Sequence, residues 1–157
     1  MNYVTKSPND YHLNLRRITQ HRSMECWYVA ASMVLGFRSA SKAVIAMSSN
    51  LDSIIRVFTN GGLYPSEVEK FGQEVGLRSA ARPGNAGAGW YSKFLKMNGP
   101  IWIAIRDVQG GHCVVIYGVQ GDSVALADPS AGRPFPRMMT IGELNLRAAP
   151  VPVLYSR

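Results

Sequence analysis

The sequence predicts an α+β domain in which N-terminal helices pack on a C-terminal antiparallel sheet. Apolar residues recur at helical spacing before a loose, glycine-rich segment at 81–89. After position 100 the pattern changes to β-branched and aromatic runs joined by tight turns, which is typical of antiparallel strands. Helices first and strands second is the order of an α+β domain, and we expect the helices on one face of the sheet.

The length fits one domain. The chain has 157 residues, of which 46% are hydrophobic and 17% charged, so it can bury a core and is too poor in charge for a disordered chain. We expect a single domain over 1–157, with an N-terminal extension at 1–18, a helical half at 20–80 and a sheet half at 99–157.

Five helices are expected before the first long strand. The two best-defined ends are a capping-box spacing from Ser66 to Glu69 and Gly76 in the position of a C-terminal cap. The first helix is expected to stop at Gly36. The expected helices cover about 25–35, 41–47, 51–58, 67–75 and 90–97.

Three consecutive strands are expected to form a meander. They cover 101–106, 112–119 and 123–128, with short turns between them. Thr140 and Glu143 repeat the capping-box spacing before a further short helix, and the apolar run at 151–155 fits a last strand.

The charge of +7 raises the question of an anionic partner. Only Arg16 and Arg17 are adjacent, and no aromatic residues interleave with a basic stripe, so we expect a solvated basic surface and no nucleic acid as partner. No run of about 18 apolar residues occurs, and the N-terminus lacks the apolar centre of a signal peptide. We therefore expect neither a membrane span nor a Sec signal.

The two cysteines, Cys26 and Cys113, are not expected to pair. Cys113 follows His112 in an alternating strand, where successive side chains point to opposite faces. If His112 faces Cys26, Cys113 faces away. Because the cysteines are not expected to pair, we expect the protein to work in a reducing compartment. The adjacency of His112 and Cys113 also argues against a metal ion between them, and no cofactor is expected.

Cys26 has the position that a reactive thiolate needs. It opens a helical pattern, where unpaired backbone N–H groups and the helix dipole favour negative charge. A nucleophilic thiolate also needs an imidazole as general base and acid, and His112 stands at the start of an apolar strand after two glycines. Asp128 ends the neighbouring strand, so antiparallel pairing is expected to bring it beside His112 and let it orient the ring.

The oxyanion of an acyl-transfer intermediate needs hydrogen-bond donors. Gln20, six residues before Cys26, could supply its amide together with the Cys26 backbone N–H. Trp27 is expected in the core and cleft wall. Gly111 and Trp90, the latter beside the glycine-rich segment, are further candidates for substrate binding.

These residues resemble the papain-like cysteine peptidases. Gln20, then Cys26-Trp27 at a helix start, then Gly-Gly-His before a strand and Leu-Ala-Asp-Pro after the next one, follow the order of that family over 20–144. The segment 99–132 is similar to the family's histidine and aspartate strands. The resemblance implies a papain-like fold with Cys26 as nucleophile, His112 as general base and acid, Asp128 as orienting residue and Gln20 as oxyanion donor.

Within that family the compact bacterial effector and toxin peptidases are most similar, with leader peptidase domains of bacteriocin exporters as relatives. Exporter peptidases usually have a Cys-Gly-Pro-like sequence, whereas this chain has Cys-Trp-Tyr. The resemblance implies a cysteine endopeptidase that a secretion system delivers into the cytoplasm of a target cell, where it cleaves a protein substrate. A producing cell would then need a cognate immunity or inhibitor protein.

Three alternatives stay open. A leader or self-processing peptidase would cut one partner, and a glutamine deamidase or transamidase would use the same acyl-enzyme without cleaving the chain. A non-enzymatic binding module would keep its function after Cys26→Ala.

Overall fold

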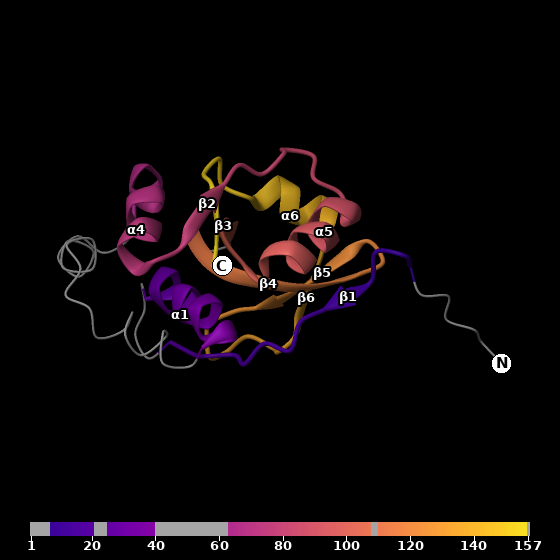
Figure 1. The fold of residues 1–157 in the computed structure, drawn as a ribbon, viewed down its shortest axis with the longest axis horizontal. Coiled ribbons are helices and arrows are strands. Elements are labelled where there is room, and N and C mark those ends of the chain that lie inside the picture. The colour runs from indigo at the N-terminus through magenta and orange to yellow at the C-terminus, as the bar shows by residue number, and fades with distance from the viewer. Residues whose placement is uncertain (1–6, 21–24, 40–62, 108–109, 157) are drawn as a thin grey trace.

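The computed structural model describes residues 7–20, 25–39, 63–107 and 110–156 and is built around an antiparallel sheet (Figure 1). Among these residues the sheet has seven strands, of which six follow the order β2-β7-β3-β4-β5-β6, and β1 pairs with β4 beside this path. The strands are β1 (Tyr11–His12), β2 (Arg78–Ala80), β3 (Ile101–Asp107), β4 (Gly110–Gln120), β5 (Ser123–Ala127), β6 (Arg137–Thr140) and β7 (Val153–Tyr155).

The expected meander is confirmed in β3, β4 and β5. Strand β3 pairs with β4 over its whole length, from Ile101↔Ile116 to Asp107↔Gly110. Strand β5 continues the meander, and the last expected strand is present as β7, which joins β2 to β3. Strands β1, β2 and β6 are not predicted by the sequence, because they have two to four residues and no apolar alternation.

The described helices lie on both faces of the sheet. They are α1 (Cys26–Arg38), α4 (Val68–Val75), α5 (Ala88–Asn98) and α6 (Ile141–Arg147), with a 3-10 turn η1 (Pro65–Glu67) before α4. One core joins α1 and α4 to the side chains of Trp102, Val115 and Leu154, whereas a second core joins α5 and α6 to Ile103 and Ile116. Figure 1 shows α1 below the sheet and α5 and α6 above it.

The expectation of helices on one face only is therefore wrong. Strands β3 and β4 are almost continuously apolar, and successive side chains of a strand point to opposite faces. Both faces of these strands are buried, and each requires a covering layer.

The helix ends agree with the sequence in part. Gly76 caps α4 with φ of 86°, a left-handed conformation that favours glycine, and the Thr140 hydroxyl accepts a hydrogen bond from the Glu143 N–H at 3.2 Å. Gly36 does not stop α1, which continues to Arg38, and Ser66 lies within η1 and does not cap α4. The helices expected at 41–47 and 51–58 lie outside the described residues.

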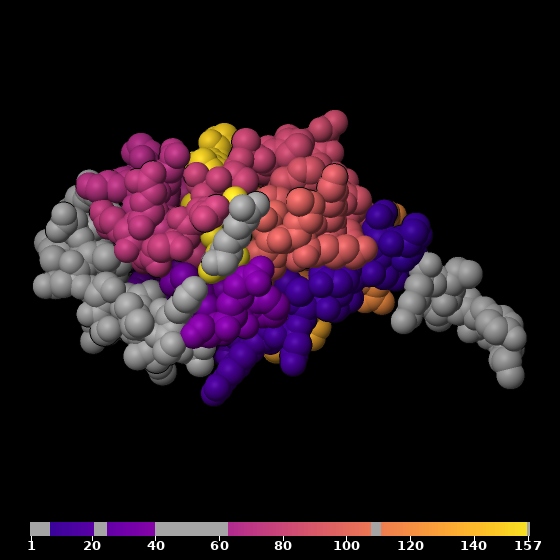
Figure 2. Space-filling view, in the orientation of Figure 1, coloured from indigo at the N-terminus to yellow at the C-terminus, as the bar shows by residue number. Residues whose placement is uncertain are grey.

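The N-terminal segment is held to the sheet along β4 and the end of β5. The Leu13 N–H donates to the Tyr117 carbonyl at 2.9 Å, and the Gln20 N–H donates to the Pro129 carbonyl at 2.7 Å. In the space-filling view this segment and α1 lie next to each other, below the region that contains α5 (Figure 2). In the part of the chain that the structure describes, no helix has the length and hydropathy of a membrane span.

Candidate active site

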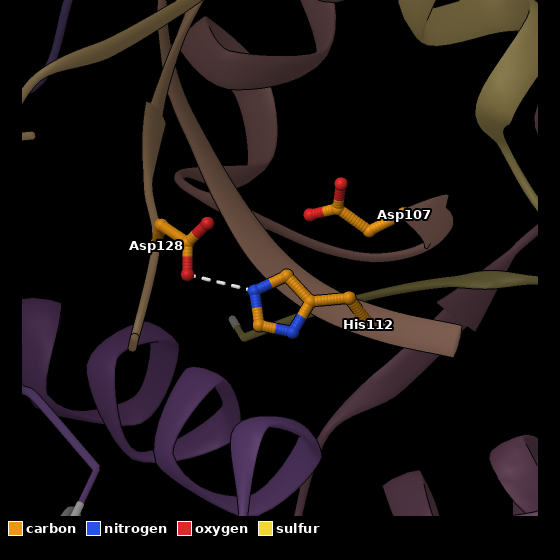
Figure 3. Close-up of side chains that lie close together, drawn as sticks. All are labelled: Asp107, His112 and Asp128. Atoms are coloured by element: carbon orange, nitrogen blue, oxygen red, sulfur yellow. Dashed lines mark hydrogen bonds and ion pairs between the residues drawn. The ribbon is translucent and has the colours of Figure 1, made fainter. Parts of the chain in front are cut away.

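His112 and Asp128 are in direct contact. His112 lies near the start of β4 and Asp128 directly after β5, so the antiparallel pairing of these strands places them together, as the sequence predicts. The His112 Nε2 lies 2.7 Å from the Asp128 Oδ1, and the two side chains point toward each other in Figure 3. This contact uses Nε2 and leaves Nδ1 of the imidazole for another partner.

Cys26 is the first residue of α1, where the sequence places it. Its thiol contacts two side chains of β4, Cys113 and His112. A hydrogen bond with the Cys113 side chain, followed by a hydrogen bond with His112 and the charge of its ring, lowers the pKa of Cys26 to about 5, although burial opposes this shift. Cys26 is therefore a thiolate at neutral pH.

His112 carries the matching positive charge. Burial by itself lowers the pKa of His112, but the hydrogen bonds to Asp128 and Cys26 and the negative charges of both residues outweigh burial and raise the pKa to about 9. Between about pH 5 and 9 the two side chains form a thiolate–imidazolium pair.

Asp128 is fully buried and is held as a carboxylate. Burial alone raises the pKa of Asp128, but hydrogen bonds from His112, the Ser130 N–H and Arg137 outweigh it and hold the pKa well below its usual range. The Ser130 N–H donates at 2.9 Å to the oxygen that faces His112, while Arg137 Nη1 donates at 2.7 Å to the other oxygen. Both oxygens of the buried carboxylate are thus paired.

Asp107 lies beside this pair, as Figure 3 shows. One ligand atom from each of Asp107, His112 and Asp128 lies within 4.8 Å of the others, which is a spacing that a metal ion could bridge. Asp107, however, pairs with the guanidinium groups of Arg133, Arg137 and Arg147 at 3.3 to 3.5 Å. These contacts make the cluster an ion-pair network, and the surrounding positive charge disfavours a cation there.

Three more of the predicted residues line a cleft of about 910 Å³ together with Cys26 and His112. They are Gln20, Trp27 and Gly111. Trp27 is buried and also fixes the cleft wall from behind, because its carbonyl accepts a hydrogen bond from Trp102 Nε1 at 2.9 Å.

Trp90 is not brought to the cleft. Its ring stacks on Phe94 with 5.1 Å between the centroids, and it packs against the core that α5 and α6 form on the other face of the sheet. A position beside a glycine-rich segment gave no information about the face on which the side chain lies.

Cys113 does not face away from Cys26, and that expectation is wrong. Cys113 is buried in the core under α1, Cys26 packs against the same core, and both thiols line the cleft. Strand alternation separates His112 from Cys113 only for a partner that lies over one face of β4. Cys26 instead lies where it meets both His112 and Cys113, two successive residues at the start of the strand.

Two arginines of this region were missed in the sequence. Arg137 joins Asp128 to Asp107, and Arg17 donates to the carbonyls of Asp128, Ser130 and Arg133 at 2.9, 2.6 and 3.0 Å. In the sequence, Arg17 stands out only as one of two adjacent basic residues. Neither arginine has a local pattern that signals its role, because each acts on residues brought near by the fold.

The arrangement is suited to nucleophilic attack on a carbonyl. It combines a thiolate at a helix N-terminus, an imidazolium that can donate a proton, and a buried carboxylate that fixes the ring. The amide-bearing Gln20 lines the same cleft, whose volume of about 910 Å³ is in the range of ligand-binding clefts.

Residues 8–143 match the family described as papain-like cysteine protease AvrRpt2. No curated protein sequence matches the chain.

Among solved structures, the chain is similar to a double glycine motif protease from an AMS/PCAT transporter, crystallised in complex with the leader peptide. The identity is 19%, the TM-score 0.61, and the match covers 92% of this chain and 91% of that chain. It is also similar to the peptidase domain of Streptococcus ComA, a bi-functional ABC transporter involved in a quorum sensing pathway, with 14% identity, a TM-score of 0.55 and 93% and 100% coverage. At these identities the likeness concerns the fold.

Proposed function

The chain belongs to the AvrRpt2 family of papain-like cysteine proteases, and from this premise we propose that Cys26, His112 and Asp128 are its catalytic triad and Gln20 its oxyanion donor. The observation that carries this assignment is the position of the His112 ring between two partners. Its Nε2 contacts Asp128, and the ring also contacts the Cys26 thiol. In this arrangement the imidazole is oriented by one partner and paired with the other.

In the proposed reaction, the Cys26 thiolate attacks the carbonyl carbon of a peptide bond. The side-chain amide of Gln20 and the Cys26 backbone N–H stabilise the oxyanion of the tetrahedral intermediate. His112 protonates the leaving amine, which departs and leaves a thioester on Cys26. His112 then takes a proton from water, the hydroxide attacks the thioester, and the acid product and the Cys26 thiolate are released.

Asp128 supports both steps. It fixes the ring plane of His112 and stabilises the imidazolium, while its own charge is held by Arg137 and the Ser130 N–H. Trp27 and Gly111 line the substrate cleft beside the reacting sulfur.

The proposed substrate is a protein in the cytosol of a target cell, which the peptidase reaches as a secreted effector or toxin domain. Support for this context comes from the AvrRpt2 family match and from the Cys-Trp-Tyr sequence, which differs from exporter peptidases. A cognate inhibitor protein in the producing cell is part of the same proposal.

The second candidate is a leader or self-processing peptidase. It is favoured by the similar solved structures, one of which is a double glycine motif protease holding its leader peptide. A third candidate, deamidation or transamidation of glutamine, would use the same thioester with a side-chain amide as substrate.

The test is expression of the wild type and Cys26→Ala in a bacterial cytosol, followed by a proteome-wide search for new protein N-termini. We expect termini that appear only with the wild type. A parallel incubation with double-glycine leader peptides tests the second candidate.

An intact substrate heavier by about one mass unit, with no new termini, would indicate deamidation in place of proteolysis. Equal behaviour of both variants would contradict the role of Cys26.

A further inference from the structure

We propose that Cys26 and Cys113 are a reversible redox pair, in which peroxide oxidises Cys26 and Cys113 then closes a disulfide with it. Cys26 and Cys113 both line the cleft and pack in the same core, and their side chains are in contact. Both cysteines are free in the structure. The effect of the disulfide on activity rests on the proposed function of Cys26, whereas its formation does not.

The packing of α1 on β4 brings the two cysteines together. Cys113 lies within β4, whose hydrogen bonds to β3 pair it with Ala104, and Cys26 lies on the first turn of α1 against the same core. A disulfide requires Cα atoms about 4.4 to 6.8 Å apart. Cys26 and Cys113 must reach this spacing for the bond to close, and side chains that are already in contact are placed to do so.

The two sulfurs differ in reactivity, which sets the order of events. Cys26 is partly exposed in the cleft and is a thiolate at neutral pH, with a pKa of about 5. Cys113 is 7% exposed, and burial, followed by the hydrogen bond to Cys26 and its negative charge, raises the pKa of Cys113 well above its ordinary value. Peroxide therefore reacts first with Cys26, since the thiolate is the oxidisable form.

The chemistry balances with hydrogen peroxide as the oxidant. The Cys26 thiolate attacks one peroxide oxygen, the O–O bond breaks, and Cys26 becomes a sulfenic acid while hydroxide leaves. This step removes the negative charge beside Cys113 and eases the loss of its proton. The Cys113 sulfur then displaces the sulfenic hydroxyl, which leaves with the Cys113 proton as water, and the S–S bond forms.

The disulfide would block the nucleophile and protect it at the same time. A sulfenic acid without a neighbouring thiol is oxidised further to sulfinic acid, which thiol reductants do not reverse. With Cys113 in contact, Cys26 is diverted to a state that a dithiol reductant restores. Inactivation of the wild type is thus expected to be reversible.

The test treats the full-length wild type with hydrogen peroxide and measures its intact mass and its tryptic peptides under non-reducing conditions. We expect a covalent link between the peptides that contain residues 23–38 and 107–137, and a mass lower by about two units relative to the same level of methionine oxidation. After dithiothreitol, the wild type is expected to regain its free thiols and its starting activity.

Cys113→Ser is the matched variant, because it keeps the size and hydrogen-bonding capacity of the side chain without a resolving sulfur. At the same peroxide dose we expect a sulfenic acid on its Cys26 that dimedone traps, and then a mass gain of about 32 units and permanent loss of activity. Cys26→Ser is the second control, and its Cys113 is expected to remain reduced.

Two results would overturn the proposal: no linked peptide in the oxidised wild type, or equal rates of sulfinic acid formation in the wild type and Cys113→Ser. The wild-type result needs no variant, so a folding defect in Cys113→Ser does not decide the matter. A linked peptide in a protein without peptidase activity would support the redox pair and contradict the proposed function. Peptidase activity that depends on Cys26, in a protein that forms no linked peptide, would support the proposed function and contradict the redox pair.

Discussion

At Cys26 and His112, opposite charges stabilise each other in a partly buried site. Each side chain alone would be mostly neutral near pH 7 to 8, because the ordinary pKa of a thiol is about 8.5 and that of an imidazole about 6.5. In contact, each side chain favours the charged form of the other. The pKa of Cys26 falls to about 5 and that of His112 rises to about 9. The consequence is a thiolate and a proton donor present together over the physiological range.

The pH dependence of alkylation follows from these values. The thiolate of Cys26 is lost as the pH falls through about 5, and the proton of His112 is lost as the pH rises through about 9. We expect iodoacetamide to label Cys26 in preference to Cys113 at pH 6, with a rate that falls below pH 5, measured by peptide mass spectrometry.

His112→Ala serves as the control for the alkylation rate. It is expected to move the labelling of Cys26 to higher pH, because the thiolate loses its positively charged partner. Equal, slow labelling of both cysteines in the wild type would contradict a low pKa of Cys26.

The triad residues are expected to differ in importance. In the proposed reaction, His112 transfers a proton in both steps, whereas Asp128 acts by orienting the ring that it contacts. We expect His112→Ala to lower kcat on the order of 10⁶-fold and Asp128→Ala on the order of 10⁴-fold, by analogy with serine triads. The assay is steady-state kinetics on proteins checked for folding by circular dichroism, and equal losses in folded variants would be evidence against this ranking.

Arg137 is expected to act on catalysis through Asp128. Arg137→Gln removes one of the two charged partners of the buried Asp128 carboxylate, and the expected loss of unfolding free energy is about 3 kcal/mol. The pKa of Asp128 should rise, because the carboxylate loses a charged donor, and a less firmly held carboxylate should lower kcat. The free energy is measured by urea unfolding and kcat by steady-state kinetics across pH, where the acid limb should stay with Cys26 at about pH 5.

Arg133→Gln is the matched control for Arg137. Arg133 also pairs with Asp107, but its side chain is 43% exposed, against 12% for Arg137, and it does not pair with Asp128 in the contacts found. We expect a loss below about 1 kcal/mol and an unchanged kcat. Similar effects of the two substitutions would mean that Asp128 does not depend on Arg137.

At the scale of elements, the N-terminal segment connects two parts of the site. Its Gln20 N–H donates to the Pro129 carbonyl, and Arg17 binds three carbonyls of the loop that begins at Asp128. The loop and the segment therefore fix each other, and through them the proposed oxyanion donor keeps its place relative to the triad.

Arg17→Ala is expected to weaken this connection. The loss of its charged hydrogen bonds should lower the unfolding free energy by about 2 kcal/mol. It should also lower kcat toward the level of Gln20→Ala, a loss of about 10²-fold if the donor is displaced. Arg16→Ala, at the exposed neighbouring position, is the control and should leave both quantities near the wild type. An equal loss in both variants would indicate an effect of charge alone.

Over the whole molecule, the sheet serves two cores at once. The core under α1 carries the reactive site, and the core under α5 and α6 supports the sheet from behind. Because β3 and β4 contribute side chains to both, neither core can be lost while the other keeps its strands.

We expect one cooperative unfolding transition, as for a single domain. Trp27 and Trp102 report on the first core, and Trp90 on the second, so tryptophan fluorescence and far-ultraviolet circular dichroism should give the same midpoint in urea. The Trp90→Phe variant, which reports mainly on the first core, should keep that coincidence. Separate midpoints would contradict the single domain.

The sequence by itself determined the local features of this protein. The α+β class, the meander of β3 to β5, the start of α1 at Cys26 and the contact of His112 with Asp128 follow from apolar patterns and from the geometry of adjacent antiparallel strands. These features depend on residues close in sequence or on neighbouring strands.

Only the tertiary structure decided what depends on packing between distant segments. Helices lie on both faces of the sheet, and Trp90 packs on the face away from the cleft. Arg17 binds the backbone carbonyl of Asp128, and Arg137 binds its buried carboxylate. The tertiary structure also set Cys113 against Cys26, because the position of a helix end over a strand is fixed by the packing of the whole core and leaves no trace in the alternation of the strand.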